Sequence, residues 1–68
     1  MAKKIVLSKP LEPDQAHDLL SKLSENSPTQ LLDDNKTFIH VSPGDARIIK
    51  AFARRKKITV ANESEMHG

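Results

Sequence analysis

Two proline-led stretches with helical spacing separate three short β-rich runs, and this alternation limits the fold more than any other feature. Pro13 and Pro43 each stand where a first helical residue is expected, because the first turn does not use the amide hydrogen that proline lacks. β-branched residues gather in 3–8, 37–41 and 58–60, as is typical of strands. We therefore expect the element order β-α-β-α-β.

The first helix is predicted over residues 13–25 and the second over residues 43–57. Apolar side chains recur at helical spacing in both: Ala16, Leu19, Leu20 and Leu23 in the first, and Ile48, Ile49, Phe52 and Ala53 in the second. Ser42 is expected to cap the second helix, with Asp45 reaching back as in a capping box. Each helix is therefore expected to bury one apolar side against the rest of the protein.

Helices that lie between strands imply parallel strand pairing and right-handed crossovers. If sequential strands are neighbours, both helices cover one face of the sheet. We therefore predict the α/β class, as a small two-layer sandwich. Residues 1–61 are expected to form a single α/β domain and residues 62–68 a flexible polar tail. The apolar run of residues 5–7 suits a strand that is covered on both faces.

Residues 27–36 leave two alternatives open. Leu31 and Leu32 need burial, whereas the Asp-Asp-Asn run that follows them is turn chemistry. A short strand that ends in a turn and a loop pinned by the two leucines both satisfy this pattern. Edge strands on both sides of the sheet also leave a homodimer through strand pairing open.

A chain of 68 residues without cysteine must fold on its apolar core, because neither a disulfide nor a thiolate zinc site can supplement it. The apolar run near the start comprises only Ile5, Val6 and Leu7. A signal peptide needs an apolar stretch of about 7–15 residues and a membrane helix about 20. We therefore expect a cytoplasmic protein that makes no membrane contact.

Residues for catalysis or metal binding are sparse. His40, Ser42 and Asp45 are close enough in sequence to suggest a triad, but the helix start already employs Ser42 and Asp45. Only two glycines are present, so no glycine-rich phosphate loop exists. His17, His40 and His67 fall on a helix, a strand and the tail, without the spacing of a metal site. We expect a protein that is not an enzyme and has no cofactor.

The second helix carries the one sequence pattern that points to a function, a row of basic residues. Residues 44–60 hold six cations against one carboxylate, although the net charge of the chain is only +2. Four of the cations recur at i, i+3, i+7 and i+10: Arg47, Lys50, Arg54 and Lys57. At about 100° per residue they fall within an arc of roughly 80° beside the apolar side. Arg55 extends this basic row at the helix end.

Three interpretations of the basic row stay open. It is a solvated helix surface that offsets the dipole, a docking surface for an acidic protein partner, or a sequence-unspecific nucleic-acid interface. We favour the acidic protein partner, with nucleic acid as the alternative. Single-stranded nucleic acid usually stacks on aromatic side chains, and Phe38 and Phe52 are both needed for the core. The helices are separated by a strand and so do not form a helix-turn-helix.

Residues 36–60 contain a strand that runs into a proline-led helix with five characteristic residues: Pro43, Arg47, Ile49, Phe52 and Arg54. In these residues the stretch resembles part of the TusA/SirA-type sulfur-carrier family, which has matching residues at similar offsets. The family carries sulfur on the cysteine of a Cys-Pro-x-Pro motif, where this chain has Lys-Pro-Leu-Glu-Pro at residues 9–13. Persulfide chemistry is therefore impossible here. The resemblance implies only the fold, a two-layer βαβαβ sandwich.

Overall fold

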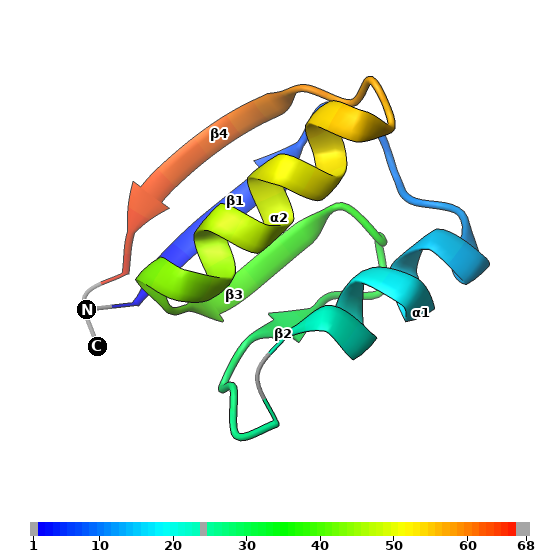
Figure 1. Ribbon diagram of the computed structural model, residues 1–68. Helices are drawn as coiled ribbons and strands as arrows, with labels where there is room; N and C mark the ends of the chain where they lie inside the picture. The colour runs from blue at the N-terminus through cyan, green and yellow to red at the C-terminus, as the bar shows by residue number, and fades with distance from the viewer. Residues whose placement is uncertain (1, 24, 67–68) are drawn as a thin grey trace.

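The computed structural model describes residues 2–23 and 25–66. Six elements follow one another along these residues: β1 (Lys3–Leu7), α1 (Pro13–Lys22), β2 (Gln30–Leu31), β3 (Thr37–Val41), α2 (Pro43–Arg55) and β4 (Val60–Glu65). Both helices lie on one face of a single sheet (Figure 1). The predicted α/β class and its two layers are confirmed.

The sheet has the strand order β2-β3-β1-β4, and every neighbouring pair is antiparallel. The prediction of parallel pairing is therefore wrong. Each helix does connect two strands that run in the same direction, but a third strand lies between them. Strand β3 separates β1 from β2, and β1 separates β3 from β4. The chain thus interleaves two split β-α-β units, in the ferredoxin-like order β-α-β-β-α-β.

Strand β1 lies in the middle of the sheet, but the helices cover only one of its faces (Figure 1). Ile5 and Leu7 point to that face and are buried, whereas Val6 is half-buried on the opposite face. The expectation of a strand covered on both faces is wrong for this reason. Three successive apolar residues reflect a central position in the sheet rather than burial of every side chain.

Strand β3 contains a bulge that lets two residues three positions apart reach the core. Ile5 pairs with Phe38 and Lys3 with Val41, so β3 has one residue more than β1 over this stretch. His40 takes a left-handed backbone conformation with φ of 56°, and its side chain is exposed. Phe38 and Val41 are consequently both fully buried. In a regular strand, residues three positions apart point to opposite faces of the sheet. The bulge inserts one extra residue and so turns both side chains to the same face.

Both helices begin at the predicted prolines and end earlier than predicted. Helix α1 ends at Lys22 rather than at residue 25, and helix α2 ends at Arg55 rather than at residue 57. Asp18 and Lys22 form an i, i+4 ion pair at 3.2 Å on the outer side of α1. Leu20 was expected in the buried stripe but is 41% exposed.

Residues 27–36 contain the short strand β2 followed by a turn, so the strand alternative is confirmed. Leu31 packs against the core, whereas Leu32 is 40% exposed and does not fulfil its expected burial. Asp34 holds the turn, because its carboxylate accepts hydrogen bonds from the Thr37 backbone N–H at 2.9 Å and the Thr37 hydroxyl at 2.6 Å. These bonds lower the pKa of Asp34. They also fix the start of β3.

The last strand lies where a tail was predicted. Residues 58 and 59 precede β4, which runs from Val60 to Glu65 and pairs with β1. The prediction of a flexible tail over 62–68 is thus wrong for residues 62–65, while residues 67 and 68 lie outside the described part. This strand could not be predicted from apolar alternation, because the side chains after Val60 are all polar or small.

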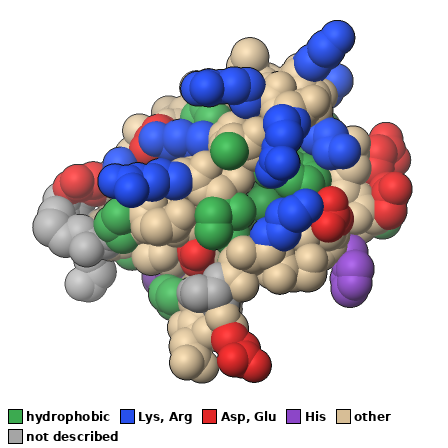
Figure 2. Space-filling view, viewed as in Figure 1, with side chains coloured by type: hydrophobic (Ala, Val, Ile, Leu, Met, Phe, Trp, Pro, Cys, Tyr) green, Lys and Arg blue, Asp and Glu red, His purple; other side chains and the backbone are tan. Residues whose placement is uncertain are grey.

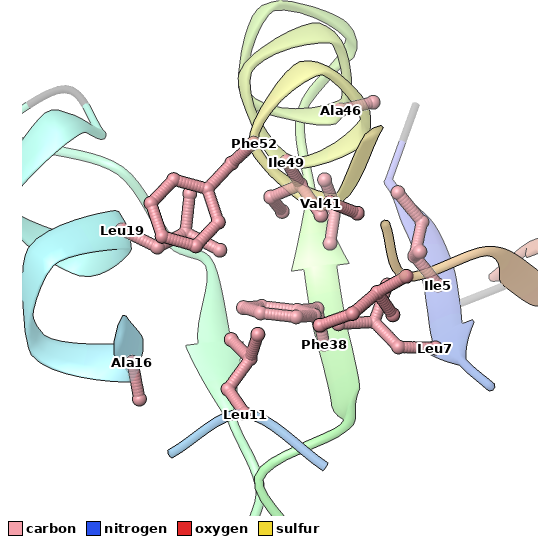
Figure 3. Packing of buried hydrophobic residues seen from close by; sticks show 12 residues of the cluster. Ile5, Leu7, Leu11, Ala16, Leu19, Phe38, Val41, Ala46, Ile49 and Phe52 are labelled. Carbon is pink, nitrogen blue, oxygen red and sulfur yellow. The ribbon is translucent and has the colours of Figure 1, made fainter. Parts of the chain in front are cut away.

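The core fills the space between the sheet and both helices. Figure 3 shows Phe52 extending from α2 toward Leu19 of α1, with Phe38 of β3 beneath them. Leu11 joins this cluster from the segment before α1. All four side chains are at most 3% exposed. This packing fixes α2 on the sheet and thereby fixes where its outer surface points.

A candidate docking surface on helix α2

The N-terminus of α2 is anchored by a buried aspartate. Ser42 is the N-cap, and its hydroxyl accepts a hydrogen bond from the Asp45 backbone N–H at 3.3 Å, as predicted. The Asp45 side chain differs from the expected capping box, since its carboxylate accepts from the hydroxyls of Ser27 and Thr29, the latter at 2.8 Å. Asp45 therefore ties the segment before β2 to α2. It also places a negative charge at the positive end of the helix.

The C-terminus of α2 ends in a Schellman motif. The Ile58 N–H donates to the Ala53 carbonyl at 2.8 Å, and the Lys57 N–H donates to the Arg54 carbonyl at 3.1 Å. Lys57 occupies the left-handed position of this motif with φ of 59°, where glycine is the usual residue. This turn buries Ile58 and directs the chain into β4.

The structure places the predicted basic residues in unlike surroundings. Arg47 is exposed on the N-terminal half of α2, and Arg55 is exposed at its last position. Lys50 is half-buried and pairs with Glu63 of β4 at 2.8 Å. Arg54 and Lys57 are exposed, and neither pairs with a carboxylate of residues 2–23 or 25–66. The predicted row therefore divides into structural and unpaired cations.

Glu63 is the ion-pair partner of Lys50, so Lys50 is not one of the unpaired cations. Its carboxylate also pairs with Lys3 at 3.0 Å, so it links β4 to both β1 and α2. The hydrogen bonds from Lys50 and Lys3 hold the pKa of Glu63 below its ordinary value of 4.5. Sequence reasoning missed this role, because Glu63 fell in the segment taken for a tail.

A shallow hollow of about 480 Å³ lies between the end of α2 and the start of β4. Its lining combines three residues of the predicted basic row with the segment that leads into β4: Lys50, Arg54, Lys57, Ile58, Thr59 and Val60. Val60 is half-buried and contributes apolar surface, whereas Ile58, at 5% exposed, is a core residue that forms part of the hollow's wall. The structure thus brings Lys50, Arg54 and Lys57 together and leaves Arg47 and Arg55 outside this hollow.

Two further cations lie over the aromatic ring of Phe52. The Lys22 and Lys56 ammonium groups each stand 5.4 Å from the ring centroid, within cation–π range. Figure 2 shows Lys and Arg side chains gathered over α2 on the face that the helices cover. Lys22 comes from α1, so sequence spacing along α2 could not predict its contribution. The basic surface is therefore broader than the predicted row.

Two of the three residues weighed for catalysis, Ser42 and Asp45, are engaged in structural contacts, and His40 has an exposed side chain. The His40 backbone N–H donates to the Met66 sulfur at 3.3 Å, while Ser42 and Asp45 serve the start of α2. No group of three or more potential metal ligands occurs in the described part of the chain. His67 lies outside the described residues. Among the helices of residues 2–23 and 25–66, none is long and apolar enough to cross a membrane.

Comparison of the chain with family models, curated proteins and solved structures found no match. The resemblance to the sulfur carriers therefore stays a prediction.

Proposed function

We propose that this chain is a non-enzymatic binding or regulatory module that docks an acidic protein partner on α2 and the adjoining hollow. The observation that carries the proposal is the pair Arg54 and Lys57. Both are exposed, neither meets a carboxylate within the described residues, and both line the hollow beside the half-buried Val60. Such a site suits a partner that offers carboxylates beside apolar side chains.

The backbone at Lys57 supports the same proposal. A lysine in the left-handed region costs about 1–2 kcal/mol relative to glycine, which adopts that region freely. Residues held in such conformations often serve a functional site. Here the lysine adds a charge to the hollow that a glycine would not supply.

Sequence-unspecific nucleic-acid binding is the second candidate, because the cations gathered over α2 suit a phosphate backbone (Figure 2). Phe38 and Phe52, the chain's two phenylalanines, are buried, and the chain has no tyrosine or tryptophan. The surface thus offers no phenyl or indole ring for stacking, which favours the protein partner. We further propose a cytoplasmic location, where a cysteine-free domain needs no disulfide.

The test is a fluorescence-anisotropy titration with an acidic probe. The probe is an eight-residue peptide with the sequence Val-Thr-Val-Thr-Val-Glu-Val-Glu. Replacing both cations (Arg54→Glu and Lys57→Glu) should weaken binding at least about tenfold. A matched variant (Lys4→Glu and Lys9→Glu) makes the same charge change away from α2 and should alter the affinity less than about twofold.

A labelled random DNA duplex, titrated at about 50 and 200 mM salt, separates the two candidates. Duplex binding that is tighter than probe binding and falls steeply with salt would replace the protein partner by nucleic acid. The acidic probe is titrated at the same two salt concentrations. If it does not bind at about 50 mM salt, or if both double variants weaken its binding equally, the proposal is overturned.

A further inference from the structure

The outer edge of β4 presents backbone groups that point away from the sheet. β4 ends the strand order, with β1 on its inner side. The Met66 N–H donates to the Ala2 carbonyl at 3.0 Å, so Met66 directs its backbone groups toward β1. Backbone groups alternate along an antiparallel strand. The N–H and C=O groups of Glu63 and Glu65 therefore point outward.

This edge begins at the basic hollow. Val60 is both the first residue of β4 and part of the hollow's lining, beside Arg54 and Lys57. An extended segment that paired with β4 would consequently pass the unpaired cations at one of its ends. The same contact would give it apolar surface from Val60, which is half-buried.

The charges along β4 decide which segment fits. In an antiparallel pairing of two β4 strands centred on their acidic ends, Glu63 of one copy lies opposite Glu65 of the other. Like charges that face each other across strands are destabilising, and charged edges commonly prevent self-pairing. A second copy of this chain is thus a poor occupant. A complementary segment is acidic where it passes Val60 and uncharged where it passes Glu65.

We infer that the outer edge of β4 binds an extended acidic segment of a partner protein as a fifth strand. The segment's carboxylates lie over Arg54 and Lys57, and its backbone bonds to that of Glu63 and Glu65. Edge-strand addition is a common mode of peptide recognition, in which the main chain supplies affinity and side chains supply selectivity. The inference rests on the proposed function, since it specifies how the acidic partner is held.

The first experiment measures backbone amide exchange of the full chain by NMR, with and without a saturating amount of the acidic probe. Exchange at Glu63 and Glu65 should slow at least about tenfold on binding, because their outward N–H groups gain acceptors. Exchange at Asn62 and Ser64 should change far less, since these residues already face β1.

The second experiment compares two substitutions at one position. Glu65→Pro removes the outward N–H without removing a hydrogen bond to β1, which an edge strand tolerates. Glu65→Ala removes the same charge and keeps the N–H. The proline variant should bind the probe at least about tenfold more weakly than the alanine variant, with its thermal unfolding midpoint nearly unchanged.

The outcomes separate this inference from the proposed function. If the probe binds through Arg54 and Lys57 but the exchange at Glu63 and Glu65 is unchanged and both Glu65 variants bind equally, strand addition is overturned. The docking of an acidic partner then stands. If the probe does not bind the wild-type chain, both ideas fall.

Discussion

Among residues 2–23 and 25–66, three residues other than glycine take a left-handed backbone conformation: Asn35, His40 and Lys57. Asn35 tolerates this region well, because its short polar side chain suits a turn. His40 adopts it at the bulge of β3, and Lys57 adopts it at the end of α2. Lysine does not favour this region, whereas histidine occurs there more often than most residues other than glycine. The sequence contains no glycine at these points that could have predicted the bulge or the early end of α2.

Replacing Lys57 by glycine separates stability from binding. Lys57→Gly should raise the free energy of unfolding by about 1 kcal/mol, because glycine adopts a positive φ without a Cβ clash. The same change should weaken binding of the acidic probe, since one cation of the hollow is lost. Urea denaturation and the anisotropy titration measure the two effects.

Lys56→Gly is the matched control. Lys56 precedes the left-handed position and has an ordinary φ of −92°, so glycine there should lower stability by up to about 1 kcal/mol. If Lys57→Gly destabilised the fold as much as Lys56→Gly, strain at Lys57 would be refuted.

At the scale of elements, prolines and caps were the most informative features. Pro13, Pro43 and Ser42 fixed both helix starts, because they act through local hydrogen bonding that the neighbouring sequence determines. The end of α2 and strand β4 depend instead on tertiary contacts. Glu63 and its partners Lys3 and Lys50 are far apart in sequence, so their ion pairs could not be predicted.

Those ion pairs predict a pH dependence of stability. Because folding lowers the pKa of Glu63 below 4.5, its ionised form stabilises the fold above that pH. This contribution is lost as the pH falls through the lower folded-state pKa. Urea midpoints between about pH 3 and 7 should therefore decline less steeply for Glu63→Gln than for the wild type.

Asp34 has a lowered pKa as well and supplies the comparison. Glu63→Gln should retain the acid sensitivity that comes from Asp34. A wild type and a Glu63→Gln variant with parallel pH profiles would show that the ion pairs between β4, β1 and α2 contribute nothing to stability.

At the scale of the whole molecule, the class and the two layers followed from the alternation of helices and strands, whereas the pairing did not. Helical connections suggested parallel neighbours, but the strand order interleaves two split units. Two features concealed this order. β2 has only two residues, and β4 lacks apolar alternation after Val60. Both strands are set by their partners in the sheet rather than by their own composition.

Truncation tests the position of β4 in the sheet. A chain that ends at Ala61 loses most of β4 and exposes one side of β1, so it should lose its cooperative thermal unfolding transition. Circular dichroism during heating provides the measurement. An unfolding midpoint equal to that of the full chain would mean that residues 62–68 form a dispensable tail after all.

We propose that Arg54 and Lys57 recognise carboxylates of a partner, and exchanging the charges on both sides of this contact tests the recognition. Wild type and the double variant (Arg54→Glu and Lys57→Glu) are each titrated with the acidic probe and with a basic probe in which lysines replace its glutamates. The wild type should prefer the acidic probe and the variant the basic probe, each by at least about tenfold. If both proteins prefer the same probe, the recognition of carboxylates by this pair is contradicted.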